Sequence, residues 1–164
     1  MGPELDADRA YYLTQFVDFS RDDGTYWKLR VMVVDGEPII RHALAAKHWI
    51  VNTTHRNRLR DQQPDLFDQE YAEMERMHRF FVAGEGRPII DQISAKLRLD
   101  YYGIDCTVLP DGQILLFEAN AAMNMLPLSD PPPPIYVRIV RRLAHMVGKL
   151  ADNRVASSGA SPSS

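Results

Sequence analysis

The stretch from Tyr101 to Asn120 reads YYGIDCTVLPDGQILLFEAN, two apolar runs separated by a turn signal. The apolar and β-branched residues predict strands over Tyr101–Leu109 and Gln113–Ala119. The Pro-Asp-Gly sequence between them is typical of a tight reversal, so the strands should form a hairpin. Asp105 and Glu118 interrupt these apolar runs. Their carboxylates are therefore candidates for chemistry.

The geometry of the turn decides whether the two acids meet. A two-residue turn at Asp111-Gly112 places Asp105 directly opposite Glu118, and strand alternation puts Asn120 on the same face. Like charges in this arrangement repel each other. Pro-Asp-Gly also favours a type I turn with a bulge at glycine, which shifts the register by a residue. In that register the acids need a further bulge to meet.

Two carboxylates and an amide oxygen on one face form an all-oxygen ligand set. Mg²⁺ and Mn²⁺ prefer such hard ligands, and a divalent cation relieves the repulsion between the acids. We therefore expect Asp105, Glu118 and Asn120 to form a metal site. Two alternatives remain. Asp105 could end a short strand while Glu118 caps the next loop, or the acids could form a glycosidase-like pair, although no aromatic-rich cleft accompanies them.

A second predicted hairpin, earlier in the chain, carries cations. Tyr26–Val34 and Pro38–Ala45 read as strands joined by a two-residue Asp-Gly turn. Lys28 and Arg30 share one face of the first strand, and this register places Arg30 opposite Arg41. Two facing cations favour an anion such as phosphate. The alternative is a solvated face on which long side chains cover apolar neighbours.

The remaining segments complete an α+β fold. We expect a first strand over Tyr11–Phe19, a basic loop over Thr53–Gln63 and a rigid connector over Pro127–Pro134. Helical periodicity predicts helices from Asp65 or Asp68 to about Val82, from Pro88 to Leu97 and from Tyr136 to Leu150. The predicted fold is an antiparallel sheet of about five strands covered by helices.

Composition excludes several classes of protein. The chain has 164 residues, 45% of them hydrophobic, which suffices for one core without disulfides or a structural metal. With 19 Lys+Arg against 22 Asp+Glu, its net charge of −3 disfavours nucleic-acid binding through bulk charge. A single cysteine suits a reducing compartment, and no segment reads as a membrane helix or signal peptide. We expect a cytoplasmic domain over residues 11–150, between a frayed N-terminus at 1–10 and a disordered tail at 151–164.

Together these motifs resemble the C-terminal lobe of the ATP-grasp superfamily over roughly residues 11–126. The hairpin over Tyr101–Asn120 carries Tyr101-Tyr102-Gly103-Ile104-Asp105, a Pro-Asp-Gly turn and Glu118-x-Asn120. These residues are similar to the family's Asp and Glu-x-Asn signature. Thr14–Val17, Lys28–Gly36 and Arg41 resemble the family's hinge and following hairpin. The resemblance implies a carboxylate–amine (or thiol) ligase: ATP phosphorylates a carboxylate, and an amine or thiol then displaces phosphate.

The resemblance also implies roles for individual residues. Asp105, Glu118 and Asn120 would hold Mg²⁺ (or Mn²⁺) that bridges phosphates of the co-substrate ATP. Arg30 and Arg41 would neutralise charge on the transferred phosphoryl group. The residues implied to contact the adenine and ribose are Gln15, Phe16, Val17 and Lys28. Lys28 departs from the acid that many family members carry at the ribose contact.

Family members clamp ATP between two lobes, and only about ten residues precede the hinge-like strand here. No lysine of this chain is placed to replace those of the first lobe. We therefore expect a fragment or truncated product that binds ATP and a small carboxylate only when a separate N-terminal lobe or self-association completes it, and that is inactive alone. The alternative is a non-catalytic remnant that binds a metal or a protein partner.

Overall fold

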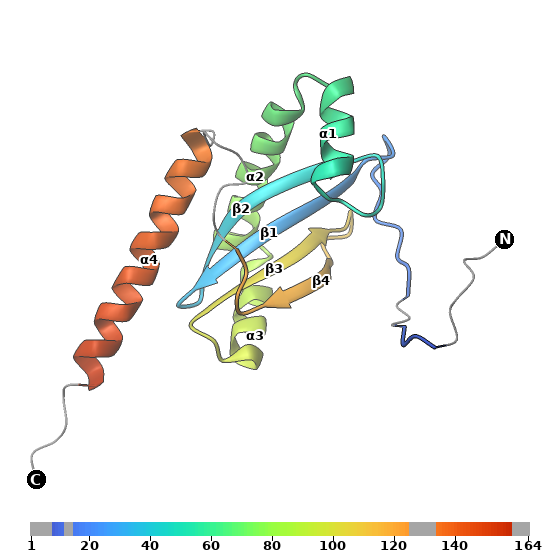
Figure 1. Cartoon of the computed structure of the whole chain (residues 1–164). Coiled ribbons are helices and arrows are strands. Elements are labelled where there is room, and N and C mark those ends of the chain that lie inside the picture. Colours follow the sequence, from blue (N-terminus) through green and yellow to red (C-terminus); the bar gives the residue numbers. More distant parts are fainter. Residues whose placement is uncertain (1–7, 12–14, 125–133, 159–164) are drawn as a thin grey trace, which may run out of the picture.

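The computed structural model describes residues 8–11, 15–124 and 134–158. Its elements, in chain order, are β1 (Tyr26–Val34), β2 (Glu37–Ala46), α1 (Thr53–Gln62), α2 (Leu66–Ala83), α3 (Arg87–Leu97), β3 (Tyr101–Val108), β4 (Ile114–Asn120) and α4 (Pro134–Ser158). The strands form one antiparallel sheet in the order β2-β1-β3-β4 (Figure 1). The predicted α+β class is confirmed, with four strands rather than five.

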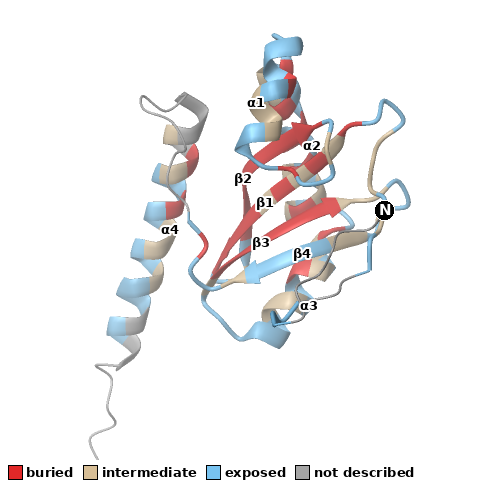
Figure 2. Ribbon diagram, turned by 45° about the vertical axis from the view of Figure 1, so that its right-hand side comes forward, coloured by how far each residue is buried: buried red, intermediate tan, exposed pale blue. Residues whose placement is uncertain are grey.

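Helices α2 and α3 contact one face of the sheet, and the other face carries polar side chains together with buried apolar residues such as Met32 and Leu44. On the face that α2 and α3 contact, the Tyr102 hydroxyl of β3 lies 2.7 Å from the Ser94 hydroxyl of α3. Trp27 of β1 contacts the Arg21 guanidinium through its ring, and Arg21 forms an ion pair with Glu73 of α2. Residues that alternate with Trp27 and Tyr102 therefore lie on the opposite face, which we call the open face. Burial is concentrated in β1, β2 and β3, whereas the edge strand β4 is largely exposed (Figure 2).

Helix α4 packs beside the β1–β2 hairpin rather than over the centre of the sheet (Figure 1). Ile139 and Leu143 are its buried contacts with the main core. The helix continues to Ser158, eight residues past the predicted end at Leu150, so residues 151–158 of the predicted disordered tail (151–164) are helical. None of the described helices is long and apolar enough to cross a membrane.

Two predicted elements are wrong. Residues 11 and 15–19 are not in a strand, and the nearest pairing is an isolated bridge between Ser20 and Tyr26. The predicted loop at Thr53–Gln63 is the helix α1. It begins where the Asn52 side chain accepts a hydrogen bond from the His55 backbone N–H at 2.9 Å. Its one buried residue is Leu59, so no helical periodicity of apolar residues marks it.

Predictions for the rest of the chain lie outside the described residues. They concern the frayed N-terminus over residues 1–7, the proline connector up to residue 133 and the tail beyond residue 158.

A buried ion pair fixes α1 against α2 and β2. Glu70 of α2 is 1% exposed and accepts hydrogen bonds from Arg56 Nε of α1 at 2.8 and 3.1 Å. The same carboxylate accepts a bond from the Ala45 backbone N–H of β2 at 3.3 Å. A buried carboxylate is costly unless it is paired and hydrogen-bonded, so Glu70 holds α1 in place through Arg56.

We expect Arg56→Gln to lower the free energy of unfolding by about 3–5 kcal/mol, because it leaves the Glu70 charge buried without its partner. Urea unfolding followed by circular dichroism measures the change. The matched control is Arg87→Gln, which removes the exposed pairs with Glu37 and Asp91 and should cost less than about 1 kcal/mol. Equal losses in the two variants would show that the buried pair has no special role.

Candidate active site

A row of four polar side chains crosses the open face from β2 to β4. His42 pairs with Arg30, Arg30 with Asp105, and Asp105 with Glu118. Directly paired residues of neighbouring antiparallel strands project from the same face. The four side chains therefore form one continuous line, which we call the polar row.

Two irregularities in the β3–β4 hairpin bring Asp105 and Glu118 together. The turn has the glycine-bulge form: Gly112 has φ +81°, its N–H donates to Leu109 O at 2.9 Å, and Leu109 N–H donates to Gln113 O at 2.8 Å. A further bulge at Phe117 then shifts the register back, so that Asp105 faces Glu118. The predicted pairing of the acids is confirmed, but it arises by the alternative register with its extra bulge.

Asp105 is held by two cations of β1. Arg30 donates from Nε to Oδ1 at 2.7 Å and from Nη2 to Oδ2 at 2.9 Å, and Lys28 Nζ approaches Oδ2 at 3.1 Å. Burial works to raise the pKa of Asp105, but the hydrogen bonds and charge of Arg30, together with the charge of Lys28, outweigh it and leave the pKa below its usual value. Asp105 is therefore a carboxylate at neutral pH although it is only 4% exposed.

Glu118 and Asn120 complete the oxygen set at the exposed edge. Asn120 donates from Nδ2 to Glu118 Oε1 at 3.1 Å, while its Oδ1 accepts the Ala122 backbone N–H at 2.8 Å. Asn120 is paired with Gly103, two residues before Asp105, so its side chain shares the open face. The structure thus brings the three predicted metal ligands onto one surface.

This donor set fits a hard divalent cation as a partial site. Its groups are two carboxylates and an amide, which are ligands that Mg²⁺ and Mn²⁺ accept, and Glu118 is exposed. Among the described residues no three His, Cys, Asp or Glu side chains form a metal cluster on their own. Oxygens from a bound substrate would have to complete the coordination. Both Asp105 oxygens already accept bonds from cations, so a metal would share them.

The predicted pairing of Arg30 with Arg41 is wrong. A bulge opposite Arg30 and Val31 shifts the register, so Arg30 faces His42 and Val31 faces Ile40. Arg41 is 1% exposed. The Asp-Gly turn signal could not reveal this change because the bulge lies far along the strands from the turn.

The predicted hinge residues lie in a non-regular segment before β1. Gln15 and Phe16 are exposed, and the Phe16 ring meets the Trp49 ring edge-to-face at 5.8 Å between centroids. Trp49 belongs to the loop after β2. The structure therefore places this segment beside that loop and does not bring it into the polar row.

Sequence reasoning missed His42. Both of its ring nitrogens are buried and have no hydrogen-bond partner among the described residues, and the residue is 3% exposed. The pKa of His42 is lowered to about 3, mainly by burial and further by the charges of Arg30 and Arg41. The ring is therefore neutral at physiological pH and adds no charge to the row. The only signal was the polar Arg41-His42 pair inside an apolar strand.

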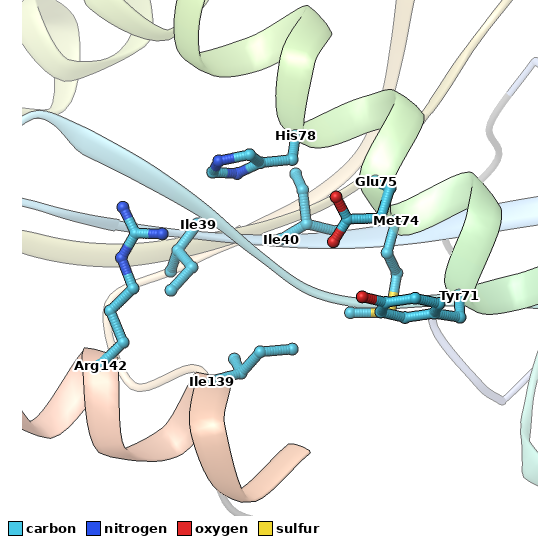
Figure 3. A pocket seen from close by; sticks show the side chains of 8 residues that line it. All are labelled: Ile39, Ile40, Tyr71, Met74, Glu75, His78, Ile139 and Arg142. Carbon is cyan, nitrogen blue, oxygen red and sulfur yellow. The ribbon is translucent and has the colours of Figure 1, made fainter. Parts of the chain in front are cut away.

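Two pockets formed by described residues lie outside the polar row. One, of about 250 Å³, is bounded by β2, α2 and α4, with Ile39, Ile40, Met74 and Ile139 as its apolar lining and Tyr71, Glu75, His78 and Arg142 as its polar lining (Figure 3). A second, of about 220 Å³, lies between α1 and the loop after β2. Neither contains a residue of the polar row. Within the row, His42 and Asp105 are buried, whereas Glu118 is exposed.

Comparison with known proteins yields two solved structures. No protein-family model and no curated protein matches the sequence. The first structure is the macrocyclase MdnB from Microcystis aeruginosa MRC, with 19% identity over 66% of this chain and a TM-score of 0.32. The second is a RiPP-associated ATP-grasp ligase from Chryseobacterium gregarium in complex with ADP and a leader and core peptide, with 17% identity over 62% of this chain and a TM-score of 0.31. The matches cover 30% and 27% of those two chains.

The buried neutral His42 predicts a loss of stability in mild acid. The unfolded chain binds a proton at this ring below about pH 6.5, whereas the folded chain does so only near pH 3. The unfolded state therefore holds more protons in this window, and stability falls as the pH drops, by on the order of 4 kcal/mol. Asp105 acts in the same direction, but only below its unfolded value of 3.8.

Urea unfolding between pH 7 and pH 4 in His42→Leu measures this effect. The variant should lose most of the pH dependence and be no less stable at pH 7, because it removes two buried nitrogens that lack partners. His145→Gln, at an exposed position, should keep the dependence of the parent chain. An unchanged slope in His42→Leu would mean that other groups control acid unfolding.

Proposed function

We propose that this chain provides the metal- and phosphate-binding surface of an ATP-grasp-type carboxylate–amine (or thiol) ligase. The observation that carries the proposal is the polar row, in which Asp105 lies between Arg30 and Glu118 on the open face. A cation-supported acid, a second exposed acid and a nearby amide on one sheet face are the groups that the Asp and Glu-x-Asn signature implies.

Each group in the row has a physical role in this proposal. Asp105, Glu118 and Asn120 would hold Mg²⁺ or Mn²⁺, which when bound offsets the negative charge of the ATP phosphates. Lys28 and Arg30 offer N–H donors to phosphate oxygens on the same face. Arg30 is already oriented by its two bonds to Asp105, so less side-chain entropy is lost when it meets a ligand.

The proposed reaction has two steps. A carboxylate oxygen of the substrate attacks the γ-phosphorus of ATP, and ADP leaves with the electrons of the broken P–O bond. An amine or thiol then attacks the acyl carbon, and inorganic phosphate leaves. Both steps concentrate negative charge on phosphoryl oxygens, which the cations of the row are placed to offset.

The proposal includes a second structure that covers the open face. Phe117 on the edge strand β4 is 40% exposed, although its ring already meets Phe19 at 5.0 Å between centroids. A separate N-terminal lobe or a second copy of the chain would bury the rest of this ring and supply the remaining nucleotide contacts.

One observation favours the alternative, a non-catalytic remnant of the same fold. Lys28 and Arg30 together satisfy both oxygens of Asp105, which forms a closed cluster without a metal. In that case the cluster would serve stability, and a cation bound by the row would not respond to ATP.

Manganese binding separates the two functions. Electron paramagnetic resonance of Mn²⁺ added to the full chain should show bound ion, and Glu118→Gln should lose it, because an exposed carboxylate is removed without disturbing the core. Asn120→Asp should bind Mn²⁺ more tightly, since it adds a negative charge to the same oxygen set. Glu85→Gln, an exposed acid outside the row, is the matched control and should bind as the parent does.

Addition of ATP then tests the ligase itself. A change in the spectrum of the bound Mn²⁺ on adding ATP is expected for a shared metal–phosphate complex. Binding of Mn²⁺ with no response to ATP, in the chain alone or after addition of excess chain, supports the remnant. Equal Mn²⁺ binding in Glu118→Gln and the parent would overturn the site.

A further inference from the structure

The second pocket is basic and lies outside the polar row. It is lined by Lys47, His48, His55, Arg58, Leu59 and Gln62, and encloses about 220 Å³ between α1 and the loop after β2. No acidic side chain is among its lining residues. The whole chain has a net charge of −3, whereas four basic or ionisable groups surround this one cavity. The local charge is therefore opposite in sign to the net charge of the chain.

Both histidines hydrogen-bond to the backbone of Ile50, one to its N–H and the other to its carbonyl oxygen. The Ile50 N–H donates to His48 Nδ1 at 3.0 Å, so this nitrogen carries the lone pair and the proton of the neutral ring is on Nε2. The Ile50 carbonyl lies 2.7 Å from His55 Nδ1 and can only accept, so His55 Nδ1 carries a proton. His48 therefore offers an Nε2–H donor, whereas His55 Nε2 becomes a donor only when the ring is protonated.

This arrangement favours an anion over a metal. The rings are close, with 4.1 Å between their centroids, but a metal bound by both Nε2 atoms needs a lone pair on each. His48 Nε2 cannot supply one while its Nδ1 accepts the Ile50 N–H. An anion requires only donors, which His48 supplies at once and His55 supplies after taking up a proton.

The other polar lining groups are donors as well. Arg58 makes no hydrogen bond or ion pair with any described residue, and its guanidinium is suited to two oxygens of one tetrahedral anion. The Gln62 amide adds a neutral donor. Lys47 donates to the Asp23 backbone carbonyl. The charged groups that line the pocket beside the two histidines are Lys47 and Arg58.

We propose that this pocket binds the phosphate group of a small phosphorylated molecule. Its volume corresponds to about seven water molecules, which exceeds a five-atom phosphate group and leaves space for an attached fragment. A nucleic-acid backbone fits less well because the overall charge is negative and the basic groups are confined to one cavity. This site is independent of the proposed ATP surface, since the two share no residue.

Calorimetry of the full chain with pyrophosphate as the probe tests the pocket. Arg58→Gln should weaken binding roughly tenfold or more, because it removes a charge-assisted contact. Arg60→Gln is the matched control: it removes the same charge from the same helix at an exposed position outside the pocket, and should bind as the parent does.

Proton uptake gives a second, independent measurement. Sulfate has the shape of phosphate but exchanges no proton near neutral pH, so any uptake on binding comes from the protein. Calorimetry in buffers of different ionisation enthalpy should show uptake for the parent and none for His55→Asn, in which the amide can still donate to the Ile50 carbonyl. His48→Asn keeps an acceptor for the Ile50 N–H and should weaken binding without abolishing the uptake.

Three results would overturn the proposal. They are the absence of saturable binding of pyrophosphate and sulfate by the parent chain, equal weakening by Arg58→Gln and Arg60→Gln, and preferential binding of Zn²⁺ that His48→Asn removes. The second would indicate bulk charge, and the third a metal site. The proposed ligase function would survive any of them, because its own test uses Mn²⁺ and Glu118.

Discussion

The Arg30–Asp105 pair is the interaction on which the open face depends. It joins the two central strands, β1 and β3, through two hydrogen bonds of 2.7 and 2.9 Å beside a third from Lys28. A carboxylate that is only 4% exposed cannot stay charged without such partners. The pair therefore does two things: it keeps Asp105 ionised, and it orients Arg30 for any anion that approaches.

Bulges decide which groups join this pair. The bulge in β2 removes Arg41 from the row and brings in the neutral His42, which lowers the positive charge beside Arg30. The bulge in β4 turns Phe117 out of register and brings Glu118 to Asp105. Without the bulge in β2, Arg30 would face Arg41, so a cation would face a cation. Without the bulge in β4, Phe117 would lie opposite Asp105.

The buried charges on the helical side serve a different purpose. Glu70 and Arg56 fasten a short, very polar helix that buries only Leu59. The same helix carries His55 and Arg58 into the basic pocket. A helix with so little apolar surface is a weak structural element by itself. Its position, and with it the geometry of the pocket, follows from one ion pair at its buried side.

The sequence by itself determined the α+β class, both hairpins, helices α2 and α3, and Asp105 and Glu118 as the unusual acids of the β3–β4 hairpin. These depend on local signals: apolar periodicity, turn residues, and acids placed inside apolar runs. Only the tertiary structure decided that His42 rather than Arg41 faces Arg30, that Thr53–Gln62 is helical and that His48 and His55 share a pocket. Bulges, ion pairs between elements and backbone contacts of side chains join residues that are distant along the chain, and no local pattern records them.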